Sequence, residues 1–450
     1  MRIAYFSPLN PVKVGISDYS EELLPHLSRY AKIDLFIDNY QPANKEIREN
    51  FNLFHYLTLE NRLKDYDIIL YHIGNNPAHT YIYNSLMKYP GVVVLHDFVL
   101  HHLALKAMVD SGNWEEYMEE MKDSYGDTGA LASIQVLKGY GRDTLYFLYP
   151  FNERLLSQAA GVIVHSDYLK KTIQKKFPRL PVARVNHGIK LRPQEDFNWI
   201  EAKQKLGIRE DTFVISSFGF LTGAKSPEAM LRAFKLFHRR HKNSLLLLVG
   251  KVDEELDLTG LIEKHSLKSS IRTTGYVDLK TFYKYICLSD VCLNLRYPSG
   301  GETSGAILRI MACGKPIVVS NYGQFAELPD NCCIKVDLGK NQLAELVAYL
   351  NLLWQDEELK LKIGQNAQNY IQQNYTWEIS ARQYARCLPR FKPAMKKKGE
   401  IGRQTLLDRR REFGHHLITE LISRMENLGI SGKAQDYLTS ILLELEIMPA

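Results

Sequence analysis

The sequence has 450 residues, of which 45% are apolar and 24% are charged, with a formal net charge of +6. This composition is that of a globular protein with room for two or three domains, and no apolar run approaches the ~18 residues that cross a bilayer. Nine basic and three acidic residues lie between Arg390 and Glu412, an excess equal to that of the whole chain, so the remaining body is nearly neutral and does not suggest a nucleic-acid-binding surface.

The first letters, MRIAYFSPL, pass directly into a strand-like run, so we expect no secretory signal and a cytoplasmic protein. All six cysteines lie in the second half of the chain, and none has the spacing of a metal site. We therefore expect free thiols in a reducing compartment.

Short β-branched runs alternate with helical patterns along the chain, which predicts parallel sheets. Several runs are continuously apolar, as strands covered by helices on both faces should be. The runs lie at 2–7, 33–38, 67–73, 91–96, 161–166, 182–188, 213–219, 245–250, 271–276, 291–296 and 316–320.

Eleven strands are too many for one open sheet, and an eight-fold barrel fits the count poorly. The segment 188–198 has the composition of a linker. We therefore predict an α/β protein with two Rossmann-like domains, residues 1–190 and 191–375, followed by a helical tail over 376–450.

Ligands of open parallel sheets bind outside the carboxyl ends of the strands. Unusual polar and small residues gather at those ends in both halves, so a cleft between facing domains is the predicted site. These residues are Gly74 to Asn76, His96 and Asp97, His187 and Gly188, Gly219 to Lys225, Gly250 and Lys251, Gly275 and Tyr276, and Arg296.

The stretch NLRYPSGGETSGAILRIMACGKPIVVS, residues 294–320, predicts a helix that begins near Thr303, Ser304 and Gly305. The free N–H groups of such a helix form an anion site, and small residues allow close approach. Glu302 beside that anion would suit the binding of sugar hydroxyls. A capped glycine-rich turn without a ligand is the alternative.

The stretch SSFGFLTGAKSPEAMLRAF, residues 216–234, places Gly219 after a strand and Lys225 just ahead of a helix. This arrangement suits a phosphate cradle, although the Walker lysine spacing is absent. A solvated lysine is the alternative.

The order and spacing of several motifs resemble those of the retaining glycosyltransferases of family 4. The motifs are FGFLTGAKSPEAMLRAF, RTTGYVDLKTFYKYICLSDVCLNLR, GETSGAILRIMACGKPIVVS and QFAELPD, with SPLNPVKVGISDYSEELLPHL and VVVLHDFVLHHL in the amino half. The resemblance covers roughly residues 1–375. It implies the GT-B fold, in which two facing Rossmann-like domains hold a nucleotide-sugar between them.

The chain departs from that family at three places. The family has two glutamates eight positions apart, where this chain has Gly301 and Arg309, with Glu302 one step after the first. Phe220 replaces an arginine that normally lies five residues before the lysine. We hypothesise that Arg296 supplies the missing positive charge.

The resemblance also implies roles for residues outside the two main stretches. His96 would contact the transferred sugar, and Asp97 would orient His96 or the acceptor hydroxyl. Gly15 would let the first loop approach the diphosphate, and Tyr276 and Val277 would flank the base. We interpret His101 and His102, one turn after His96, as helix-surface or acceptor-side residues.

A metal-dependent glycosyltransferase of the GT-A class needs an Asp-x-Asp pair, and Asp65 and Asp67 supply one. The pair precedes a strand, however, and so lies at its amino end, away from a ligand crevice. We therefore expect no metal and no cofactor. Lys225, Arg296 and the helix beginning at residues 303–305 would neutralise the leaving diphosphate.

These observations predict a metal-independent retaining transferase that uses a nucleotide-sugar donor and a glycan, lipid-linked or protein-linked acceptor. A GT-B-shaped binding or regulatory subunit, and a nucleotide-sugar epimerase of the same shape, remain as alternatives. The basic segment near the carboxyl terminus suggests a peripheral contact with anionic lipid or an acidic partner, or else a solvated linker before a pair of packing helices or an oligomer contact.

Overall fold

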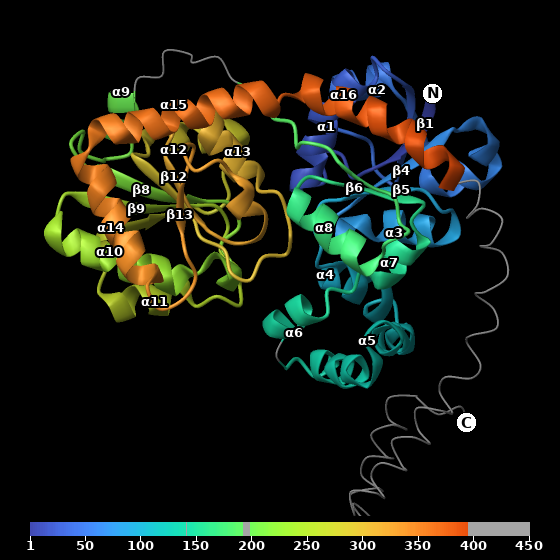
Figure 1. Ribbon diagram of the computed structural model, residues 1–450, viewed down its shortest axis with the longest axis horizontal. Coiled ribbons are helices and arrows are strands. Elements are labelled where there is room, and N and C mark those ends of the chain that lie inside the picture. The colour runs from blue at the N-terminus through green and yellow to red at the C-terminus, as the bar shows by residue number, and fades with distance from the viewer. Residues whose placement is uncertain (141, 192–198, 395–450) are drawn as a thin grey trace, which may run out of the picture.

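The computed structural model describes residues 1–140, 142–191 and 199–394, and contains two parallel sheets that lie side by side (Figure 1). The first sheet has the order β3-β2-β1-β4-β5-β6-β7 and the second has the order β10-β9-β8-β11-β12-β13. Every strand pair is parallel, as predicted from the alternation of strands and helices.

The strands of the first sheet are β1 (Arg2–Phe6), β2 (Lys32–Ile37), β3 (Asn52–His55), β4 (Ile68–Ile73), β5 (Val92–Leu95), β6 (Gly161–Val164) and β7 (Val182–Arg184). Those of the second sheet are β8 (Phe213–Phe218), β9 (Ser244–Val249), β10 (Ile271–Thr273), β11 (Val291–Asn294), β12 (Ile317–Ser320) and β13 (Ile334–Val336).

The helices of the first half are α1 (Gly15–Leu27), α2 (Lys45–Asn50), α3 (Thr80–Lys88), α4 (His101–Ala104), α5 (Trp114–Leu137), α6 (Arg142–Leu148), α7 (Glu153–Gln158) and α8 (Asp167–Lys176). Those of the second half are α9 (Trp199–Lys205), α10 (Pro227–Arg240), α11 (Leu258–His265), α12 (Leu279–Leu288), α13 (Gly305–Ala312), α14 (Gln342–Gln355), α15 (Glu357–Asn374) and α16 (Trp377–Cys387).

Each sheet is buried on both faces, which explains why its central strands are continuously apolar. In β1, Phe6 belongs to the core under α3 and α7, whereas Tyr5 belongs to the core under α1 and α16. The second sheet is covered in the same way by two further clusters. Five cysteines lie in the second domain and one in α16; four of the six are buried, and all six are free thiols.

Helix α16, which the sequence placed in the tail, returns to the first sheet. Figure 1 shows α15 and α16 running end to end, the first over the second sheet and the second over the first sheet. The Tyr384 hydroxyl of α16 lies 2.8 Å from that of Tyr19 on α1, and the Trp377 indole donates to Glu22 at 2.9 Å. The first globular unit is therefore built from both ends of the described chain.

In the described ranges, no helix combines the length and the apolar character that a membrane crossing requires. The predicted linker falls partly, and the basic tail almost wholly, outside the described residues, which end at residue 394.

Candidate functional site

The carboxyl edges of the two sheets meet. The loop after β5 contacts the glycine loop before α13, where the Phe98 amide donates to the Gly300 carbonyl oxygen at 2.7 Å. A second contact comes from Glu327, whose carboxylate accepts hydrogen bonds from the amides of Asp167 (3.1 Å) and Tyr168 at the start of α8. The residues that follow these strands therefore face one another across a domain interface.

Helix α13 begins where the sequence predicted. Ser304 is its N-cap, and the Ser304 hydroxyl oxygen accepts a hydrogen bond from the Ile307 amide at 3.4 Å. The preceding loop is fixed by Gln324, whose side-chain amide donates to Ser299 Oγ at 2.8 Å and to the Glu302 carbonyl oxygen at 2.6 Å. Thr303 and Gly305 complete this turn and are both partly buried.

Lys225 ends a short 3₁₀ turn (Gly223–Lys225) between β8 and α10, and is only 3% exposed. Its ammonium donates to the Phe218 carbonyl oxygen. Gly219 has φ +87°, and a Cβ there would lie 3.1 Å from Lys225 Nζ. Burial, and secondarily the charge of Arg296, lower the pKa of Lys225 well below its usual range. Among the described residues, no carboxylate forms an ion pair with this buried lysine.

Arg296 follows β11 and forms an ion pair with Glu302. Its backbone amide donates to Ser320 Oγ at 2.9 Å, while its Nε is buried without an acceptor among the described residues. Burial lowers the pKa of Arg296 to about 10, and Asp97 opposes that effect. The Tyr297 amide, next to Arg296, donates to the carbonyl oxygen of Ala224, next to Lys225, at 2.8 Å, so the two cationic residues lie on adjacent loops.

Both basic side chains already have partners within the protein. Glu302 forms an ion pair with Arg296, and Lys225 donates a hydrogen bond to the Phe218 carbonyl oxygen. Glu302 was predicted to bind sugar hydroxyls; here its Oε1 pairs with Arg296, and its Oε2 accepts a hydrogen bond from Ser299 Oγ at 3.4 Å.

Asp97 and His96 follow β5 and have different surroundings. Asp97 accepts a hydrogen bond from the Asn75 amide at 2.7 Å. Burial raises the pKa of the Asp97 carboxyl, while the Asn75 amide and Arg296 act in the opposite direction. His96 is 9% exposed, and its Nε2 lies 3.0 Å from Nδ1 of His72. One nitrogen of His96 is thus directed into the first domain.

Sequence reasoning missed a row of histidines at this edge. The ring centroids of His72 and His96 are 5.3 Å apart, those of His96 and His165 are 5.1 Å apart, and those of His165 and His187 are 5.5 Å apart. The four residues belong to the ends of β4, β5, β6 and β7, which are neighbours in the sheet. The signal was present in the sequence as a histidine near the end of four successive strands, in LYHI, VVLH, VIVH and VNH.

The remaining predicted donor residues lie around the mouth of the interface. Gly15 begins α1 and is exposed. Tyr276 is 71% exposed, and its ring lies 5.9 Å from the Lys13 ammonium of the first loop. Val277 is partly buried beside it.

Two other predictions concern histidines after β5. His102 is exposed, in agreement with the prediction of a helix-surface residue. The prediction is wrong for His101, which is fully buried, because its ring stacks on Tyr146 at 4.6 Å and bonds to the Tyr117 hydroxyl at 3.1 Å.

The Asp-x-Asp pair lies at the amino end of β4, as predicted. Asp67 accepts hydrogen bonds from the Arg2 amide at 2.8 Å and from Lys392 at 2.9 Å, so it serves as a structural ion-pair partner. Among the described residues, no group of three or more histidine, cysteine, aspartate or glutamate side chains is arranged to hold a metal ion.

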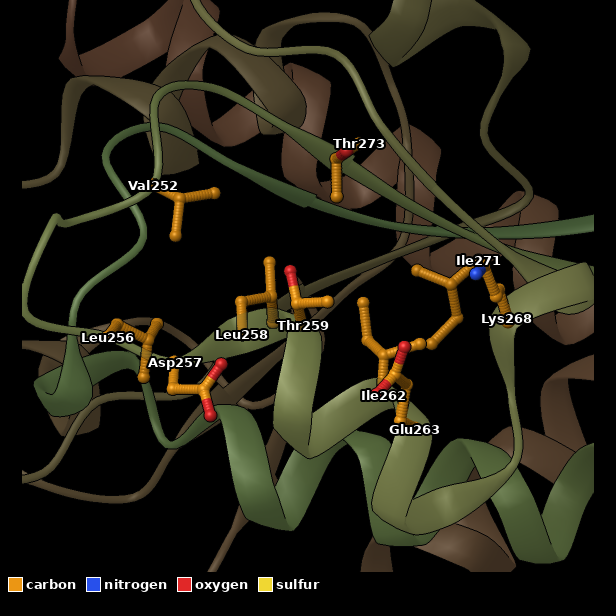
Figure 2. Close-up of a pocket in the computed structure, with 10 residues that line it drawn as sticks. All are labelled: Val252, Leu256, Asp257, Leu258, Thr259, Ile262, Glu263, Lys268, Ile271 and Thr273. Carbon is orange, nitrogen blue, oxygen red and sulfur yellow. The ribbon is translucent and has the colours of Figure 1, made fainter.

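A cavity of about 330 Å³ lies elsewhere, between α11 and the edge strand β10 (Figure 2). Its walls are mainly apolar, with Leu258 and Ile262 from α11 facing Ile271 of β10. None of the predicted site residues lines it. It is therefore separate from the interface described above.

Residues 200–370 match the sequence profile of the family described as Glycosyl transferases group 1. The chain is 27% identical over 167 residues to an uncharacterized glycosyltransferase of Methanocaldococcus jannaschii, covering 37% of this chain and 42% of that protein. It is 29% identical over 208 residues to the alpha-monoglucosyldiacylglycerol synthase of Acholeplasma laidlawii, covering 45% and 48%. The matches thus span about half the length of these relatives.

The fold is similar to that of solved structures over a larger part of the chain. Sucrose-phosphate synthase from Thermosynechococcus elongatus has a TM-score of 0.59 at 16% identity, over 87% of this chain and 99% of that structure. Anabaena HepE in complex with UDP-glucose has a TM-score of 0.60 at 16% identity, over 87% and 100%. The chain has the GT-B fold.

Proposed function

We propose, on the premise that residues 200–370 form a glycosyl transferases group 1 domain, that this protein transfers a sugar from a nucleoside-diphosphate donor to an acceptor hydroxyl. The observation that carries the proposal is the buried Lys225, whose one hydrogen-bond partner among the described residues is the Phe218 carbonyl oxygen, and which lies beside Arg296 where two carboxyl edges meet. A buried ammonium is costly without an anion, and a diphosphate would pair with Lys225 and, once Glu302 withdraws, with Arg296. The bound UDP-glucose of HepE makes UDP-sugars the first donors to test.

In the proposed reaction the acceptor oxygen bonds to the anomeric carbon while the bond from that carbon to the leaving phosphate oxygen breaks. The leaving oxygen takes the acceptor proton, and attack from the same face retains the configuration. Lys225, Arg296 and the first amides of α13 stabilise the charge that develops on the diphosphate. These groups do so without a metal ion, because cationic side chains and helix amides supply the positive charge.

Donor binding also rearranges one ion pair. The diphosphate replaces Glu302 as the partner of Arg296, and the released carboxylate accepts hydrogen bonds from sugar hydroxyls. Asp97 lies across the interface from Arg296, near where the acceptor hydroxyl would lie, and His96 lines the same edge. The acceptor would be a glycan or a lipid-linked sugar, and the protein would act in the cytoplasm or against the inner face of a membrane.

The test is incubation of the purified protein with UDP-, GDP- and ADP-sugars, with and without EDTA, while release of the nucleoside diphosphate is followed. Transfer to added glycan or lipid extract that persists in EDTA is the expected result. Tight binding of a nucleotide-sugar without turnover would favour a regulatory subunit, and conversion of the sugar without an acceptor would favour an epimerase. No binding of any nucleotide-sugar would refute the proposal.

A further inference from the structure

Arg309, in the second turn of α13, is partly buried and forms no ion pair among the residues that the structure describes. Its Nε is buried and has no hydrogen-bond acceptor there. Guanidinium groups remain charged in proteins and carry five donors, so a buried N–H of such a group needs an acceptor. The surroundings of Arg309 indicate which acceptor that is.

The Arg309 guanidinium lies beside Gly305. A Cβ at Gly305 would be 2.7 Å from Nη1 of Arg309, so a larger residue there would displace the guanidinium from this position. The guanidinium therefore lies against the first turn of its own helix, where unpaired N–H groups already carry positive partial charge. A cation at this end of a helix is unfavourable unless an anion lies beside both.

Arg309 and Arg296 face different points of the opposite sheet edge. Burial and, in addition, the charge of Arg309 lower the pKa of His187, which follows β7. Against the raising effect of burial, the charge of Arg296 lowers the pKa of Asp97, which follows β5. One strand, β6, separates β5 from β7, so these two points are about 10 Å apart. The turn that begins α13 lies between the two arginines, with Glu302 paired to Arg296 on one side and Gly305 against Arg309 on the other.

We propose that Arg309 binds the phosphate next to the nucleoside, while Lys225 and Arg296 bind the phosphate next to the sugar. This inference rests on the proposed function and adds a third cation to the donor site. At this position the resembling family has a glutamate, which would accept hydrogen bonds from hydroxyl groups. An arginine instead donates to phosphate oxygens, and its planar fork suits two of them at once.

The experiment measures dissociation constants by calorimetry for pyrophosphate, UMP, UDP, GDP and ADP. Arg309→Gln should weaken the binding of UMP and of UDP by a similar factor of about 10–100, as expected for the loss of hydrogen bonds to a charged group. Lys225→Met should weaken the binding of UDP by a comparable factor and the binding of UMP by less than about threefold. Arg209→Gln, which changes an exposed arginine beside Asp211, is the matched control and should leave every constant unchanged.

UMP and UDP affinities of Arg309→Gln within twofold of the wild type would overturn the inference, as would equal effects of Lys225→Met on both nucleotides. Should Arg309→Gln unfold, Arg309→Met keeps the aliphatic stem and removes the charge, and the same criteria apply. Lost UMP affinity in Arg309→Gln, together with no sugar transfer by the wild type, would support the role of Arg309 and refute the proposed function. Wild-type protein that binds neither pyrophosphate nor any of the nucleotides would refute both.

Discussion

Nδ1 of His72 lies 3.0 Å from Nε2 of His96, deep in the row of histidines at the carboxyl edge of the first sheet. One of the two nitrogens donates and the other accepts, and burial lowers the pKa of both rings well below the usual range, which keeps them neutral. Protonation of the accepting nitrogen would place two N–H groups against each other in a buried setting. Burial also lowers the pKa of the other two rings of the row, His165 and His187. The stability of the first domain should therefore depend on pH in the acid range.

Acid should destabilise the protein through these rings. Burial lowers the pKa of His165 to about 4, whereas an unfolded histidine titrates near 6.5. Between these pH values the unfolded chain binds more protons, so the free energy of unfolding falls as the pH falls. The contribution is about 1.4 kcal/mol per pH unit for each such ring. Urea unfolding at pH 7.5, 6.5, 5.5 and 4.5 measures this slope.

The contribution of one ring is isolated by His165→Gln. This variant should be less stable at neutral pH, and its slope between pH 6.5 and 4 should be smaller than that of the wild type by about 1.4 kcal/mol per pH unit. His55→Gln, at a partly exposed position, should keep the wild-type slope. Identical slopes for all three proteins would contradict the assignment.

Removal of the Lys225 ammonium should lower activity without lowering the stability of the fold. Lys225→Met keeps the volume of the side chain and removes an ammonium that is 3% exposed, so the melting temperature should stay the same or rise. The same change should lower kcat/KM for the donor by about 10²-fold, because a group that stabilises the leaving diphosphate is lost. Thermal unfolding and steady-state kinetics test the two parts.

Lys264→Met is the control, since Lys264 also belongs to the second domain but is exposed and paired with Glu228 at 3.2 Å. It should leave kcat/KM within twofold of the wild type. Equal activities of the two variants would show that Lys225 does not act on the donor.

Most of the fold could be predicted because its central strands are buried on both faces and therefore continuously apolar. The two strands that the sequence did not predict, β3 and β13, are edge strands of three or four residues with partly exposed side chains. Their sequences, NLFH and IKV, carry too few apolar residues to stand out from a loop. Tertiary pairing, not local pattern, makes them strands.

Less of the site could be predicted, because its contacts join residues far apart in the chain. The helix start at Ser304 has a local signature, and the sequence predicted it. The pairing of Glu302 with Arg296 and the contact of Glu327 with α8 depend on how two sheets face each other, which no local pattern specifies. The histidine row did have a signal, but the signal becomes meaningful only once β4, β5, β6 and β7 are known to be neighbours.

Glu327 should hold the two domains together. Its carboxylate lies at the start of α8, where it meets unpaired amides and the positive end of the helix. Glu327→Gln should therefore speed hydrogen exchange at the amides of Asp167 and Tyr168 and enlarge the radius of gyration measured by X-ray scattering. Glu345→Gln removes a similar carboxylate that caps the Asp337 amide at 3.0 Å within one domain, and should change neither quantity. Domain separation that is equal in both variants would contradict this role.

Restoring the family-like glutamate at residue 301 should harm the protein. Gly301 has φ +76°, a conformation that costs other residues roughly 1–2 kcal/mol. A Cβ there would also lie 2.6 Å from Leu169 Cδ2 and 2.9 Å from Phe98 Cβ, both in the opposite domain. Gly301→Glu should therefore push the domains apart and lower transfer activity by at least about tenfold, as measured by kcat/KM.

Gly300→Ala separates the effect of contact from that of any change in the loop. The nearest atom to a Cβ at Gly300 is Oε2 of Glu302 at 3.2 Å, at the movable end of a side chain, and the backbone there is not left-handed. This variant should retain most of the activity, whereas Gly301→Ala should lose activity in the same way as Gly301→Glu. Higher activity in Gly301→Glu than in the wild type would mean that the glycine does not serve the close approach of the two domains.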